Sequence, residues 1–66
     1  MMTKNEAENL LNKHLKRYDK YYKEIQEIKC AEFKDNFSFG VIYKNKSHMN
    51  VYCVFKHNKD VILAPT

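Results

Sequence analysis

The first third of the chain has apolar residues at intervals of three and four, the period of an amphipathic α-helix. The positions on this face are Ala7, Leu10, Leu11, His14, Leu15, Tyr18, Tyr21, Tyr22 and Ile25. Thr3 precedes the run and Glu6 follows three residues later, which is the spacing of a capping box. No Pro or Gly interrupts the pattern, so it predicts a helix over residues 4–23.

After residue 24 the apolar period shortens to two, which is typical of β-strands. The clearest alternation sets Phe37, Phe39, Val41 and Tyr43 against Ser38, Gly40 and Ile42. The expected strands cover residues 28–33, 37–43, 49–56 and 61–63, and the expected turns cover residues 34–36, 44–48 and 57–60. Short polar turns join neighbouring strands, so the pattern predicts an antiparallel meander of three or four strands.

Together these elements predict a single small α+β domain over residues 1–66, with one N-terminal helix packed on the meander. This order of elements resembles that of cystatin-like and other helix-on-sheet modules. The resemblance concerns fold order alone, and fold order does not imply a function.

The expected sheet has more apolar residues than one helix can cover. We expect Phe37, Phe39, Val41, Tyr43, Val51, Cys53 and Phe55 to face the helix. The second face, which we predict to be partner-binding, then carries Gly40, Ile42, Tyr52 and Val54, with Ile62 nearby. Three interpretations stay open: ordinary exposure, burial against another protein or a second copy of the chain, and a register shifted by one residue. Gly40 either allows another backbone to approach or marks a bulge.

Composition favours an ordered protein in a reducing compartment. The hydrophobic fraction is 44%, and no apolar stretch is long enough to span a membrane. Residues 1–6 lack the apolar run of a signal peptide, so we expect a cytoplasmic protein. Cys30 and Cys53 are then expected to be reduced and unreactive. The many Lys and Asn residues are typical of an AT-rich genome, such as that of a low-GC bacterium or its phage.

Catalytic and metal-binding patterns are weak. His14, His48, His57, Cys30 and Cys53 show none of the close spacings of zinc ligands. The carboxylates are scattered, and one glycine cannot build a phosphate-binding loop. We therefore expect no enzyme activity, no metal and no cofactor. An enzyme that uses Cys30 or Cys53 with a histidine is the least favoured hypothesis.

Basic residues gather on the side of the expected helix opposite its apolar face. They are Lys13, Lys16, Arg17, Lys20 and Lys23. The formal net charge of the chain is +4. A solvated surface, an acidic protein partner and nucleic acid each explain such a stripe.

The function that we expect from the sequence is protein binding without catalysis. The chain would act as an inhibitor or immunity-type antagonist that occludes a partner protein of unknown identity, and a homodimer through the second sheet face is also expected. The alternative is a nucleic-acid-binding protein that uses the basic helix face. No membrane partner is expected.

Overall fold

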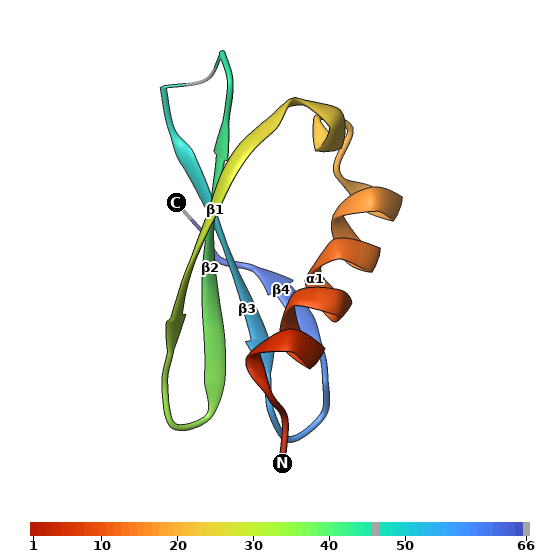
Figure 1. Cartoon of the computed structure of the whole chain (residues 1–66), viewed down its shortest axis with the longest axis vertical. Helices are drawn as coiled ribbons and strands as arrows, with labels where there is room; N and C mark the ends of the chain where they lie inside the picture. The colour runs from red at the N-terminus through yellow and green to blue at the C-terminus, as the bar shows by residue number, and fades with distance from the viewer. Residues whose placement is uncertain (46, 66) are drawn as a thin grey trace.

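The computed structural model describes residues 1–45 and 47–65 and places one helix on one side of a four-stranded antiparallel sheet. The elements are α1 (Lys4–Tyr18), the 3₁₀ turn η1 (Tyr22–Glu24), β1 (Ile25–Glu32), β2 (Asn36–Tyr43), β3 (Met49–Phe55) and β4 (Val61–Leu63). The strands follow the order β1-β2-β3-β4, and α1 lies on one side of them (Figure 1). The predicted α+β meander is confirmed. Lys46, in the predicted turn 44–48, lies outside the described residues.

The start of α1 is where the sequence predicts it. Thr3 has extended backbone angles, and its hydroxyl accepts a hydrogen bond from the Glu6 N–H at 3.2 Å. This bond satisfies one of the amides that the first helical turn leaves without a partner. From this start, Ala7, Leu11 and Leu15 fall on one stripe and are buried against the sheet.

The end of α1 differs from the prediction, because the helix stops at Tyr18. Asp19 takes an extended backbone, with φ −93° and ψ 108°, and its carboxylate accepts the Tyr21 N–H at 2.9 Å. A side chain that bonds a nearby amide in this way competes with helical bonding. Tyr21 and Ile25 still pack against the core, so the apolar period continued while the backbone changed.

The face of β2 was predicted correctly. Phe37, Phe39, Val41 and Tyr43 are at most 3% exposed and lie between the sheet and α1. Phe37 and Phe39 stack with their ring centroids 6.5 Å apart. These four side chains form the centre of the core together with the inner stripe of α1.

The face of β3 was predicted wrongly. Tyr52 is 5% exposed and Val54 is fully buried, so both face α1 and not the second face of the sheet. The register is the reason: Tyr52 lies opposite Phe39, and Val54 lies opposite Phe37. Residues opposite each other in an antiparallel pair point to the same side, so the core face of β2 fixes that of β3.

Candidate functional site: the open face of the sheet

The side of the sheet away from α1, called the open face below, carries a contiguous apolar patch. Its members are Gly40 and Ile42 from β2, Met49, Val51, Cys53 and Phe55 from β3, and Ile62 from β4. Ile42 lies opposite Met49, and Cys53 lies opposite Ile62. Directly opposed side chains are within contact distance. The patch therefore crosses three neighbouring strands without a break.

No described helix or strand covers this patch, as the nearly edge-on view of the sheet shows (Figure 1). Met49 and Ile62 are 45% and 49% exposed, while Ile42, Val51 and Phe55 are half-buried by their neighbours in the sheet. A solvated sheet face normally alternates to polar residues. The open face departs from that rule along the whole of β3.

Gly40 makes room for Met49. A Cβ atom at Gly40 would lie 2.5 Å from the Met49 Sδ, so the methionine side chain lies across the glycine. The irregularity of the β1–β2 pair falls between Ile25 and Glu27, not at Gly40. Neither a bulge nor the approach of another backbone is needed to explain the glycine at this position, because the thioether of Met49 occupies the space that a side chain would take. Met49 is a flexible side chain that can adapt to a docking surface.

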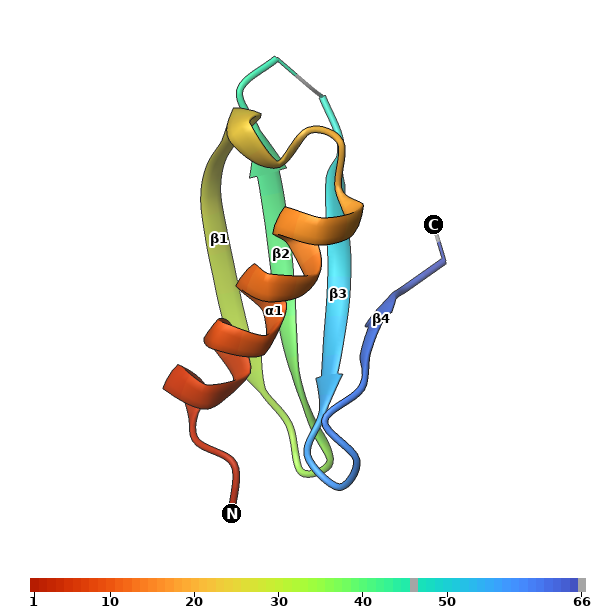
Figure 2. The same cartoon turned by 90° about the vertical axis from the view of Figure 1, so that its right-hand side faces the viewer.

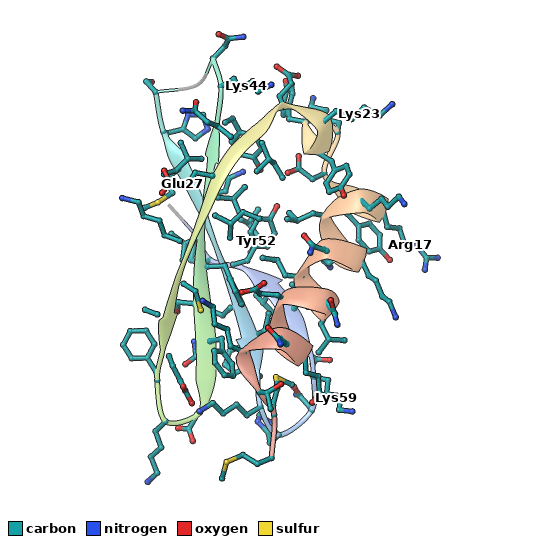
Figure 3. All side chains as sticks on the ribbon, viewed as in Figure 1. Arg17, Lys23, Glu27, Lys44, Tyr52 and Lys59 are labelled. Atoms are coloured by element: carbon teal, nitrogen blue, oxygen red, sulfur yellow. The ribbon has the colours of Figure 1, made fainter. Side chains whose placement is uncertain are left out.

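Charged residues border the patch along β1. Glu27 lies opposite Ile42 and Lys29 lies opposite Gly40, which places both on the open face. Figure 3 shows Glu27 on the side away from α1, whereas Tyr52 points toward the helix. The open face thus has an apolar centre and a charged border, the arrangement common in protein interfaces.

The opposite side of the sheet holds a polar cluster. The Tyr43 hydroxyl donates to the Asp19 carboxylate, and the Asn50 amide donates to the Tyr43 hydroxyl at 3.3 Å. Burial and the hydrogen bond to Asp19 raise the pKa of Tyr43, and burial and the Asp19 charge raise the pKa of Tyr52. These groups are bonded to one another and join the end of α1 to the sheet, so their role is structural.

The basic residues do not form one helix face. Lys13, Lys16 and Arg17 lie on α1, but Lys20 follows its end and Lys23 lies in η1. All five are exposed, and Figure 3 shows Arg17 and Lys23 pointing outward. Three of the lysines share a surface hollow with acidic residues, and its lining consists of Lys16, Asp19, Lys20, Tyr22, Lys23 and Glu24. The early end of α1 therefore breaks the predicted stripe.

The two cysteines are free and lie on opposite faces of the sheet. Cys30 lies opposite the buried Phe39, on the helix side, and burial raises the pKa of its thiol. Cys53 is on the open face, with its Sγ 3.8 Å from the Ser38 Oγ. Because the sheet separates the two thiols, they cannot bond to each other.

The described residues contain neither a metal-binding cluster nor a membrane-spanning helix. In residues 1–45 and 47–65, no three His, Cys, Asp or Glu side chains come together in a way that could hold a metal ion. Within the same residues, no helix has the length and apolar character needed to cross a membrane. His14 contacts the rings of Tyr18 and Tyr52, and His57 contacts the ring of Phe55.

Most of the patch was missed by the sequence interpretation. Val51, Cys53 and Phe55, which share one parity of the strand, were expected to face the helix, and Met49 was assigned to neither face. The available signal was the polar character of Asn50, which belongs with the Tyr43 cluster inside.

Comparisons with protein-family models, curated proteins and solved structures found no match for this chain.

Proposed function

We propose that this chain is a small non-catalytic protein-binding module that docks through the open face and occludes a working surface of its partner. An inhibitor or immunity-type antagonist acts in this way. The single observation that supports the proposal is the uncovered apolar patch across β2, β3 and β4.

The size of the patch fits a docking role. Three strands spaced by about 4.8 Å, with about 3.4 Å of rise per residue along β3, give this part of the open face an area of about 300 Å², of which Asn36 and Ser38 of β2 form a polar share. The largest exposed apolar patch on a single domain, typically a few hundred Å², is often functional. The area is below that of a standard interface, so the partner must also contact the border, where Glu27 and Lys29 lie.

The fold suits occlusion because the patch has a rigid support. β2 and β3 present the patch on one side and the fully buried Phe39 and Val54 on the other. A partner that binds such a sheet meets a preformed surface, so little conformational entropy is lost on binding. The open face is the surface of a sheet, so blocking a partner's surface is the mechanism that fits it best.

Site-specific photo-crosslinking in the cells that make the protein tests this function. A photoreactive residue at Val51 should capture a partner protein, whereas one at the matched exposed position Lys13 on α1 should not. With the captured protein purified, Val51→Lys should weaken binding strongly and Lys13→Gln should leave it unchanged. Capture from Lys13 alone, or equal affinities for both variants, would contradict the proposal.

The alternative function is nucleic-acid binding by the exposed lysines and Arg17. The hollow bordered by Lys16, Lys20 and Lys23 supports it, and Asp19 and Glu24 in the same hollow oppose it. Binding of this kind falls steeply with salt, because released counterions drive it. Titration of labelled duplex DNA and single-stranded RNA at low and moderate salt distinguishes the two functions. Salt-sensitive binding supports the alternative, whereas docking through the open face requires neither DNA nor RNA.

A further inference from the structure

β1 is the long uncovered edge of the sheet. The strand order places β1 and β4 at the two edges, and β1 has eight residues whereas β4 has three. An edge strand presents a row of N–H and C=O groups that can pair with another chain. Among the described strands, β1 therefore offers the longer edge for the addition of a strand.

The even-numbered residues of β1 direct their backbone groups outward. The Phe33 N–H donates to the Asn36 carbonyl at 2.8 Å, so this pair bonds across the first hairpin. Bonded pairs alternate along an antiparallel ladder, which makes the backbone of Lys29 face β2. The N–H and C=O groups of Ile28 and Cys30 then face the open edge.

The helix side of β1 has a hollow between the strand and α1. Figure 2 shows α1 crossing the sheet diagonally, with its N-terminal half reaching past β1. Between α1 and β1 lies a hollow of about 120 Å³, which is lined by Leu11, Ile28, Cys30 and Phe39 and also by the polar Lys4, Glu8 and Asn12. Ile28 is 36% exposed although it lies opposite the fully buried Val41, on the helix side. The helix side of β1 is thus only partly covered.

Two of the three charges in β1, Glu27 and Lys29, complement each other about Ile28, whereas Glu32 gains no opposite charge there. If two copies of β1 run antiparallel about a two-fold axis at Ile28, that residue lies opposite the partner's Ile28. Glu27 then lies opposite the partner's Lys29, and Lys29 lies opposite the partner's Glu27. Opposite charges placed directly across a ladder stabilise it, and like charges destabilise it.

Neighbouring registers lack this match. With the axis at Glu27, the two copies of Glu27 oppose each other, and with the axis at Lys29 the two copies of Lys29 do so. With the axis at Cys30, Lys29 lies opposite the partner's Ala31 and gains no opposite charge. Only the axis at Ile28 both pairs the outward backbone groups and matches the charges on the open face.

We propose that two copies of this chain associate through β1, antiparallel and with the two-fold axis at Ile28, into one continuous sheet. The isoleucine pair then covers apolar surface beside both hollows. A second copy is the occupant, and not an unrelated strand, because the sequence Glu27-Ile28-Lys29 complements itself. The inference does not depend on the proposed function: both use Glu27 and Lys29, but the apolar centre of each open face stays uncovered on one side of the joined sheet.

Sedimentation over a concentration series from micromolar to millimolar tests the pairing through a charge-swap cycle. The parent should form a reversible dimer. Glu27→Lys or Lys29→Glu alone should weaken the dimer by about tenfold or more, because each turns two attractive contacts into repulsive ones. The double variant Glu27→Lys/Lys29→Glu should restore it. Both positions are exposed, so the variants keep the fold.

Val51→Lys is the matched control, because it changes the open face and leaves the β1 edge intact. The dimer should survive this substitution, and the Ile28 amide should exchange with deuterium more slowly as concentration rises. A strict monomer at millimolar concentration would overturn the inference and make Glu27 and Lys29 charges that protect the edge. A dimer that Val51→Lys abolishes and the swaps do not affect, or a double variant without rescue, would overturn it as well.

Discussion

The two faces of the sheet are both apolar, yet only one is covered. On β3, Tyr52 and Val54 are buried under α1, while Met49 and Val51 point to the side without a helix. The buried residues of β3 include Tyr52, and the nearby Tyr43 donates a hydrogen bond to Asp19. The more apolar parity of a strand is therefore not always the core parity, because the register and the internal polar contacts decide which side is buried.

Exchanging valine for lysine on the two sides of β3 gives the largest expected contrast. Val54→Lys places a charge in the core and should cost more than about 4 kcal/mol, enough to unfold a domain of this size. Val51→Lys should change the free energy of unfolding by less than about 1 kcal/mol, because its side chain can reach solvent. Urea denaturation measures both, and similar midpoints for the two variants would contradict the assignment of faces.

Phenylalanine truncation sharpens the same contrast. Phe39→Ala should cost about 3–5 kcal/mol, since the ring is fully buried between sheet and helix. Phe55→Ala, on the half-buried open face, should cost only about 1–2 kcal/mol. Thermal melts followed by circular dichroism report both. Should Phe55→Ala prove the more damaging, the open face would be the true core.

The polar cluster predicts a dependence on alkaline pH that belongs to the covered side alone. The pKa of Tyr43 lies above its ordinary value of 10.0, so the folded state keeps the proton where the unfolded state loses it. The contribution of Tyr43 to stability is therefore fully present below about pH 10 and is lost as the pH rises above that value. Tyr43→Phe should cost about 1.5–3 kcal/mol at neutral pH and reduce the alkaline loss. Part of the alkaline loss should remain in this variant, because the pKa of Tyr52 is also raised.

The exposed Tyr18 offers the control for this measurement. Tyr18→Phe should leave both the neutral stability and its alkaline decline unchanged. Urea midpoints recorded between neutral pH and about pH 11 decide the matter. An equal decline in the parent and in Tyr43→Phe would show that the cluster does not couple the helix end to the sheet.

The smallest expected effect concerns the start of the covering helix. Thr3→Ala should lower the free energy of unfolding by about 1 kcal/mol, because the Glu6 N–H loses its acceptor. Thr3→Ser keeps a hydroxyl and should stay near the parent. Chemical denaturation resolves the difference, and equal midpoints for Ala and Ser would show that the cap contributes nothing to holding α1 on the sheet.

Much of the fold could be predicted because its local signals agree. The cap at Thr3 and the spacing of Ala7, Leu11 and Leu15 define the start and the face of α1. The strict alternation from Phe37 to Tyr43 defines the buried side of β2. These segments carry one periodicity each, and that periodicity is what the tertiary structure uses.

The rest could not be predicted, for two physical reasons. The tyrosines after Asp19 continue the helical spacing, but the Asp19 carboxylate accepts both the Tyr21 N–H and the Tyr43 hydroxyl, and the second of these partners is distant in the sequence. In β3 both parities are apolar, so the hairpin register, which pairs Ile42 with Met49, decides the faces. The open face and the β1 edge follow from the register and the order in which the strands pair, and no local motif specifies either.

The two native thiols, one on each side of the sheet, allow the most direct test of the claim that the open face is the docking surface. The parent protein is alkylated with a maleimide at low concentration, in buffer and in extract from the cells that make it, with serum albumin as the crowding control, and each site is read by mass spectrometry. The account predicts that the extract slows alkylation of Cys53 several-fold and leaves Cys30 unchanged. Equal rates at Cys53 with and without the extract, or protection of Cys30 alone, would contradict it.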